Sequence, residues 1–142
     1  MKPNINLIVA DNESVVQSAL ISNNYVQAFL LVHSLIESLL RALLNKLDPN
    51  SELCFSDLIK GYEARLAEEY YPSPTFVEEL TEFNRRRNRV IHRLWRNGFT
   101  HTNNNLKDAA EAAVHLYSLF IEWLQIFDDD LENLGFRLSD EQ

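Results

Sequence analysis

The sequence has little cysteine, glycine or proline, and these shortages narrow the possible folds. Cys54 is the only cysteine among 142 residues, so the chain cannot form an internal disulfide framework or a site of several thiolate ligands. Only three glycines and four prolines are present. A β-sandwich or β-barrel needs many tight turns and uses more of both residues. The composition therefore favours a single domain of long helices joined by few connections.

The beginning of the sequence also lacks a long hydrophobic run. The first residues, MKPNINLIVADNE, contain a short apolar stretch, which is too short for a membrane span or for the core of a secretion signal. Apolar residues still make up 46% of the chain, enough to form an ordinary folded interior. We therefore expect a soluble, cytoplasmic protein with no membrane partner.

Negative charge dominates the sequence, but the positive charges are concentrated in one segment. The net charge is −8, and six of the 13 basic residues lie in residues 85–96, which read RRRNRVIHRLWR and contain no acidic residue. Without this segment, the other 130 residues carry a charge of −14. An acidic surface repels nucleic acid, so a polyanion would be directed to this one basic segment. The alternative interpretation is an arginine-rich helix face that contacts only solvent.

Apolar residues recur at helical spacing through most of the chain. Pro49 and the pair Asn97–Gly98 are the predicted stop signals of two helices. The pattern predicts helices over residues 12–21, 24–47, 56–70, 75–96 and 106–131, a polar loop over 100–105 and an irregular, mobile acidic tail over 133–142. We therefore expect an all-α fold, an antiparallel four-helix bundle with an additional short helix, in one domain over residues 1–132.

The helix predicted over 75–96 departs from ordinary amphipathic design. At about 100° per residue, Arg87 falls ~20° from Phe76, inside the apolar stripe. Its charge would then need a carboxylate, backbone carbonyls or a phosphate as a partner. The opposite face presents three guanidinium groups, an amide and an imidazole in one row. The residues of this row are Arg85, Asn88, Arg89, His92 and Arg96.

Residues 87–92 resemble a known motif. They read Arg-Asn-Arg-Val-Ile-His, or R-N-x-x-x-H, which is one form of the R-x(4–6)-H motif of the HEPN superfamily. In that family the motif lies in a helix towards the C-terminal half of a small helical bundle, as predicted here. The helix predicted over 24–47, in which Glu37 is followed by Arg41, is similar to the long second helix of the family. The resemblance covers nearly the whole chain in architecture, and its specific part is these six residues.

The resemblance implies a metal-independent endoribonuclease. Many HEPN domains cut RNA as the toxin of a toxin–antitoxin pair or as an antiphage effector. By this resemblance Arg87 and His92 would be the catalytic pair, and Asn88 would support them. Independently of the resemblance, a structural carboxylate such as Glu37 would pair with Arg87 across the bundle and orient its guanidinium. The substrate would be tRNA or mRNA, with no metal ion and no cofactor. The residues expected to bind RNA are Arg85, Arg86, Arg89, Arg93 and Arg96.

The implied reaction is also chemically reasonable for these side chains. RNA carries its own nucleophile, the 2′-OH, so the protein needs only to assist proton transfer and to stabilise a phosphorane. A histidine with a pKa near neutrality can move the proton, and a guanidinium can hold the non-bridging oxygens. The expected products carry a 2′,3′-cyclic phosphate and a 5′-OH.

The motif also predicts a homodimer. Arg87 and His92 are five positions apart, so on a regular helix they point about 140° from each other. One histidine per chain cannot easily serve as both base and acid. A two-fold dimer would bring two histidines and two arginines into one cleft. The composite dimeric site of the family implies the same arrangement.

One position departs from the family pattern. Several HEPN toxins carry a tyrosine two residues after the motif histidine, and a partner nucleotidyltransferase silences them by adding AMP groups to it. Leu94 occupies this position here, so that modification is not available. Direct binding of a cognate antitoxin, such as a nucleotidyltransferase-type protein, stays open, as does the absence of any antitoxin.

Other interpretations of these residues stay open. A non-catalytic HEPN-type module would bind RNA, a nucleotide or a protein through the same segment, and a purely structural dimer would bury its arginines in acid pairs. His33, His101 and His115 lie on three separate segments and do not predict a zinc site. Tyr70 and Tyr71 are the aromatic residues that we expect to be exposed.

Overall fold

The computed structural model describes residues 4–47, 51–69 and 75–137, and over these residues it contains helices and no strand. The elements are α1 (Ile5–Ile21), α2 (Tyr25–Leu43), α3 (Phe55–Glu68), α4 (Val77–Asn104), α5 (Lys107–Phe127) and the 3-10 helix η1 (Asp129–Leu134). The predicted all-α class is confirmed.

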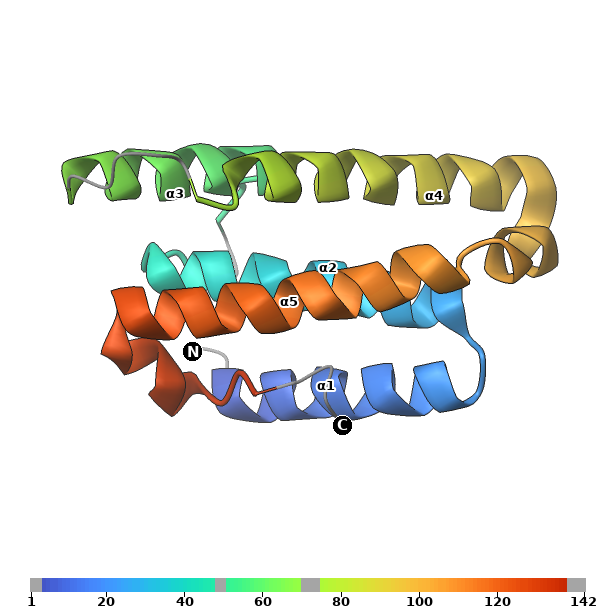
Figure 1. Cartoon of the computed structure of the whole chain (residues 1–142), viewed down its shortest axis with the longest axis horizontal. Coiled ribbons are helices and arrows are strands. Elements are labelled where there is room, and N and C mark those ends of the chain that lie inside the picture. The colour runs from blue at the N-terminus through green and yellow to red at the C-terminus, as the bar shows by residue number, and fades with distance from the viewer. Residues whose placement is uncertain (1–3, 48–50, 70–74, 138–142) are drawn as a thin grey trace.

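The helices lie in layers, with α2 at the centre (Figure 1). α3 and α4 form the upper layer, α2 and α5 the middle layer and α1 the lower layer. α2 contacts all four of the other α-helices. Its buried residues are Val26, Ala28, Phe29, Val32, His33, Leu35, Ile36, Leu39, Leu40 and Leu43. Burial of each large apolar side chain stabilises the fold by roughly 1.5–3 kcal/mol, so α2 is the main support of the core.

α2 is also the one described helix that is long and apolar enough to cross a membrane, judged by length and composition alone. A helix at the centre of a folded core passes the same test. Here the apolar residues of α2 are covered by the four helices around it.

Two asparagines in the left-handed conformation end α1 and α2. Asn23 has φ of 60° and Asn45 has φ of 57°, a region that asparagine enters more readily than most residues. After α2, the backbone N–H of Lys46 donates to the carbonyl of Arg41 at 2.7 Å, which is the closing bond of a Schellman cap. α2 therefore ends at Leu43, before the predicted end at residue 47. The proline on which that prediction depended lies outside the described residues.

α1 begins at Ile5, so the prediction of a short first helix over 12–21 was wrong. Its 17 residues bury Val9 and Val16, which lie two helical turns apart on one face. Asp11 and Asn12 resemble residues that begin a helix, but both lie inside this one.

α4 bends at Gly98 and does not end there. Gly98 has φ of 83° and ψ of 172°, outside the helical range, yet the following residues are helical again up to Asn104. The loop predicted over 100–105 was therefore wrong. The side chain of Asn103 accepts a hydrogen bond from the N–H of Val26 (3.0 Å) and donates one to the carbonyl of Asn23 (2.8 Å). Polar residues typical of a loop thus serve to fix the end of α4 to the start of α2.

The chain after α5 packs into the core. α5 ends at Phe127 rather than at residue 131, and η1 follows. Phe136 is only 1% exposed, and the N–H of Arg137 donates to a carboxylate oxygen of Glu13 in α1 at 2.9 Å. The packed part of the chain therefore extends past residue 132 to Phe136, although residues 136 and 137 have no regular secondary structure.

Candidate nucleic-acid interface

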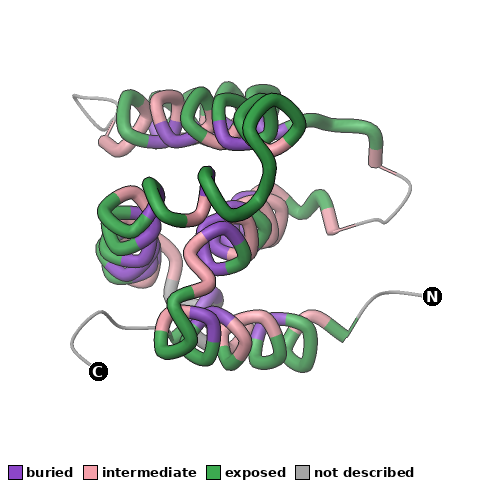
Figure 2. Tube along the Cα trace, turned by 90° about the vertical axis from the view of Figure 1, so that its right-hand side faces the viewer, coloured by how far each residue is buried: buried purple, intermediate pink, exposed green. Residues whose placement is uncertain are grey.

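The part of α4 that carries residues 85–96, the basic segment, is exposed over most of its surface. Only Val90 is buried between residues 84 and 101, and the end of α4 nearest the viewer in Figure 2 is coloured as exposed. No aspartate or glutamate occurs in the sequence from residue 83 to residue 107. The basic segment therefore presents a positively charged surface to solvent.

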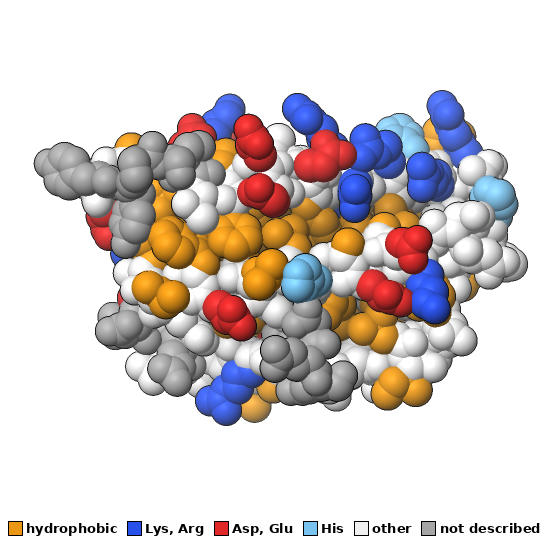
Figure 3. Space-filling model, in the orientation of Figure 1, with side chains coloured by type: hydrophobic (Ala, Val, Ile, Leu, Met, Phe, Trp, Pro, Cys, Tyr) orange, Lys and Arg blue, Asp and Glu red, His pale blue; other side chains and the backbone are white. Residues whose placement is uncertain are grey.

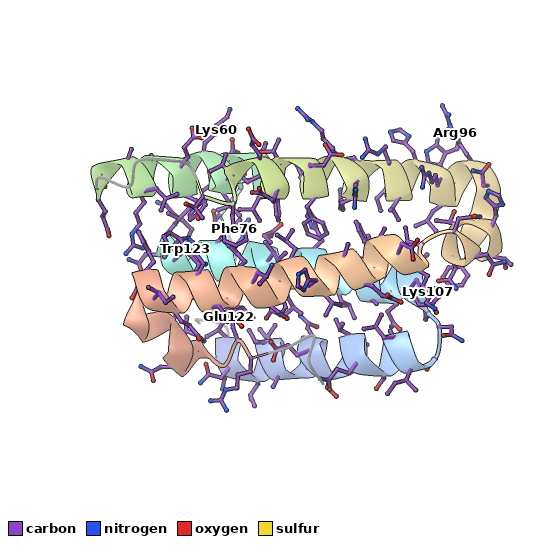
Figure 4. All side chains as sticks on the ribbon, viewed as in Figure 1. Lys60, Phe76, Arg96, Lys107, Glu122 and Trp123 are labelled. Carbon is purple, nitrogen blue, oxygen red and sulfur yellow. The ribbon has the colours of Figure 1, made fainter. Side chains whose placement is uncertain are left out.

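The row of polar residues predicted on the outer face of this helix is exposed, as expected. Figure 3 shows Lys and Arg side chains gathered over the right-hand part of α4, and Asp and Glu side chains mostly over its left-hand part. Figure 4 shows Arg96 at the outer edge of the molecule, near the right-hand end of this helix. The exposed members of the row are Arg85, Asn88, Arg89, His92 and Arg96.

Glu82, one turn before the basic segment, binds two of these arginines. Its carboxylate lies 2.8 Å from Nη2 of Arg89 and 3.6 Å from Nη1 of Arg85. The hydrogen bond from Arg89 lowers the pKa of this carboxyl below its ordinary value. Among the described residues, Arg86, Arg93 and Arg96 form no ion pair, so their charges stay available to an anionic ligand.

Arg87 is half-buried on a different side of α4 from this row. Its Nη1 donates to Oδ1 of Asn88 at 3.3 Å, which is its one hydrogen bond among the described residues. Glu37, which we expected to orient Arg87, binds Nε of Arg41 in its own helix at 3.1 Å. Arg87 therefore keeps its charge without a carboxylate partner in the described structure.

His33 of α2 fixes the start of the basic segment to the core, a role that the sequence did not indicate. Its Nε2 lies 3.1 Å from Oδ1 of Asn84 in α4, and its ring stacks on that of Phe55 at 4.2 Å between centroids. Burial lowers the pKa of His33, and the charge of nearby Arg87 lowers it further, while the bond to Asn84 opposes them. A neutral imidazole thus links three helices beside Arg87.

A cluster of exposed side chains on α4 contains His92, Trp95 and Arg96. The ring centroids of His92 and Trp95 are 6.3 Å apart, and the guanidinium of Arg96 lies 5.5 Å from the indole centroid. Trp95 is 69% exposed. The sequence instead predicted Tyr70 and Tyr71 as the exposed aromatics, and both lie outside the described residues.

Arg87 and His92 do not meet within one chain. Neither side chain forms a hydrogen bond or an ion pair with the other in the described structure, and each has a different neighbour, Asn88 for Arg87 and Trp95 for His92. This agrees with the separation of about 140° that regular helical spacing predicts. A site that uses both residues needs a second copy or a movement of α4.

A groove of about 370 Å³ lies between α4 and α5, next to the basic segment. Its α5 side consists of small and apolar residues, and Figure 3 shows a band of hydrophobic side chains between the upper and middle layers. Its α4 side carries three carboxylates. The carboxylates belong to Glu78, Glu79 and Glu82. Arg86 lines the same groove, so the acidic start of α4 and the basic segment meet there.

Metal ligands do not gather anywhere in the part of the chain that the structure describes. No group of three His, Cys, Asp or Glu residues there could hold a metal ion. Cys54 is exposed, and its thiol donates to Oδ2 of Asp57 at 3.1 Å at the start of α3.

Comparison with known proteins gives no relative: no protein-family model, no curated protein and no solved structure matches the chain. The interpretation of the basic segment therefore depends on its own residues and their geometry.

Proposed function

We propose that the protein is a metal-independent endoribonuclease of the HEPN type, which acts on tRNA or mRNA as a toxin or an antiphage effector. The observation that carries this proposal is the R-N-x-x-x-H motif of α4, in which Asn88 and His92 are exposed and Arg87 is half-buried, within a stretch, residues 83–107, that contains no acidic residue. In this proposal α2, α3, α4 and α5 form the four-helix bundle of that type, and α1 is the additional helix.

The chemistry uses the two states of an exposed imidazole. A neutral His92 takes the proton from the 2′-OH as its oxygen attacks the phosphorus, and a protonated His92 from a second copy gives a proton to the leaving 5′-oxygen. Guanidinium groups stabilise the charge that develops on the phosphorane. The bond from phosphorus to the 5′-oxygen breaks, which leaves a 2′,3′-cyclic phosphate and a 5′-OH.

A second copy is needed because one chain keeps Arg87 and His92 apart. The charge distribution along α4 supports an antiparallel pair of α4 helices. Glu79 and Glu82 lie in its first two turns, and Arg93 and Arg96 lie near its bend, all without burial. A two-fold axis near Arg89 would place the acidic end of each α4 against the basic end of the other. It would also bring both motifs into one cleft.

Cleavage of RNA in the presence of EDTA tests the proposal. Purified protein is incubated with total tRNA and a generic messenger, beside Arg87→Ala, His92→Ala and the matched control His101→Ala, an exposed histidine on the same helix. We expect the wild type and His101→Ala to produce cyclic-phosphate ends and the other two variants to leave RNA intact. Intact RNA with a folded wild-type protein would contradict the proposal.

The separation of Arg87 and His92 within one chain favours a second candidate, a non-catalytic HEPN-type module that binds RNA, a nucleotide or a protein. Binding of RNA without cleavage would indicate this function. Binding through several arginines would weaken steeply as salt is added, because the released counterions drive it. Any antitoxin of the ribonuclease would have to bind it directly, since Leu94 offers no hydroxyl for modification.

A further inference from the structure

Trp95 lies on the surface of α4, where its side chain adds little to the stability of the fold. Its side chain is 69% exposed, whereas tryptophan is strongly buried on average in globular proteins. The half-buried Leu94 beside it packs against the core, as does the buried Val90 about one turn earlier. The indole therefore contributes little to packing and is open to a ligand.

The neighbours of Trp95 indicate the chemistry of that ligand. Asn88, His92 and Arg96 are spaced four residues apart and form one row along α4, directly beside the indole. Arg96 contacts the ring as a cation–π partner, and His92 lies one turn earlier. An amide, an imidazole and a guanidinium in a row suit the phosphates and sugars of a nucleic-acid backbone, and an indole beside the row suits a base.

We propose that Trp95 stacks on an unpaired base of the RNA, so that the protein selects single-stranded RNA at this site. This inference rests on the proposed function, because it uses the same surface. In an A-form duplex the faces of the bases are covered by their neighbours, so an indole on a rigid helix cannot reach them. In a single strand or a loop, a base can turn outwards onto Trp95 while the backbone follows Asn88, His92 and Arg96.

The competing occupant of Trp95 is a second copy of this chain. Ile91 and Phe99, one turn before and after Trp95, are 38% and 50% exposed, so the patch has apolar neighbours. Charge favours RNA, because the patch contains arginines and lies in a stretch without acidic residues, so two such patches would repel each other. The antiparallel pair proposed above uses the side of α4 that carries Glu79, Glu82 and Arg93, and helical spacing places that side about 140–160° away from Trp95.

Binding measurements separate these possibilities. The parent protein carries His92→Ala, which prevents cleavage during the titration, and is titrated with a labelled single-stranded oligoribonucleotide and with the same sequence as a duplex. We compare Trp95→Ala, Trp95→Leu and Trp95→Phe with the control Leu119→Ala, which removes a 40% exposed side chain from α5. Loss of one stacked base should weaken single-strand binding by about 10- to 100-fold in the Ala and Leu variants. Trp95→Phe should keep most of the affinity, and duplex binding should be weak and unchanged throughout.

A second readout observes the indole directly. Trp123→Phe leaves Trp95 as the only tryptophan, and its fluorescence should be quenched by the single strand but not by the duplex.

Three results would overturn the inference, and they differ in what they say of the proposed function. If Trp95→Ala and Trp95→Leu bind the single strand as tightly as the parent while Arg96→Ala does not, stacking is wrong but the RNA surface stands. If neither strand binds to any folded variant, the proposed function fails as well. If Trp95→Leu turns a dimer into a monomer in sedimentation, Trp95 belongs to the interface between copies.

Discussion

Replacement of Phe136 by alanine should strongly destabilise the protein, although the sequence predicts an irregular, mobile tail at this position. Phe136 is 1% exposed and closes the core against the lower layer. Truncation of a buried phenylalanine costs about 3–5 kcal/mol. In domains of this size, each kcal/mol lowers the melting temperature by roughly 2–4 °C. We therefore expect Phe136→Ala to melt about 10 °C below the wild type in a calorimetric or circular dichroism scan.

The neighbouring residue supplies the control. The side chain of Arg137 is exposed, and its hydrogen bond to Glu13 comes from the backbone N–H, which alanine keeps. Arg137→Ala should therefore change the free energy of unfolding by less than about 0.5 kcal/mol. A Phe136→Ala protein that melts with the wild type would show that residues 133–137 do not belong to the core, and the reasoning would be refuted.

Three further predictions concern α4 and its contacts. Because burial lowers the pKa of His33, the unfolded chain takes up a proton near the ordinary histidine pKa of about 6.5, whereas the folded chain does so only at lower pH. The free energy of unfolding should therefore decrease as pH falls below about 6.5. Urea unfolding at pH 7.5 and 5.5 measures this decrease, and an equal decrease in His33→Gln would contradict burial of His33 as its cause. The double variants Glu79→Arg/Glu82→Arg and Arg93→Glu/Arg96→Glu should each fail to self-associate but should form a mixed dimer with each other in native mass spectrometry; monomers in the mixture would exclude the antiparallel arrangement. Gly98→Ala should destabilise the fold by about 1–3 kcal/mol, because alanine is strained at the positive φ of this position, while an added Cβ meets no atom within 4 Å. Chemical denaturation of this variant beside Asn97→Ala measures the cost, and equal stability of the two variants would show that the strain is absent.

Local patterns in the sequence were enough to predict the helices whose ends depend on nearby residues. Asn24 was predicted to begin a helix, and its side chain does accept from the N–H of Gln27 at 3.2 Å. α3 was predicted over 56–70 and spans Phe55–Glu68, and at its start Asp57 accepts a hydrogen bond from the N–H of Cys54. The exposed row of Arg85 to Arg96 followed from helical spacing alone.

Contacts between distant parts of the chain could not be predicted in this way. The polar residues before α5 are typical of a loop, but they form the end of α4, where Asn103 binds the backbone of Asn23 and Val26 far away in the sequence. The burial of Phe136 likewise depends on α1 and α5, which lie far away in the sequence. In the candidate site, helical spacing within residues 85–96 does not show that Arg85 and Arg89 pair with Glu82, because Glu82 lies one turn before that segment.

The exposure of Trp95 was also missed, because composition does not show which aromatic residues the core leaves out. Trp95 follows Leu94, a residue with an obvious apolar role, and a tryptophan next to it is ordinarily read as core. The signal that could have found it is its angle on α4, which lies closer to Asn88 than to Val90.

A mixed dimer of wild-type and His92→Ala protein tests most directly the claim that one cleft uses His92 of two copies. The two proteins are mixed, the mixed dimer is isolated through a tag on one copy and verified by mass, and RNA cleavage is measured in EDTA. Our account predicts that the mixed dimer leaves the RNA intact, because the cleft needs His92 of one copy as the base and His92 of the other as the acid. A verified mixed dimer that keeps half of the wild-type activity or more would contradict it.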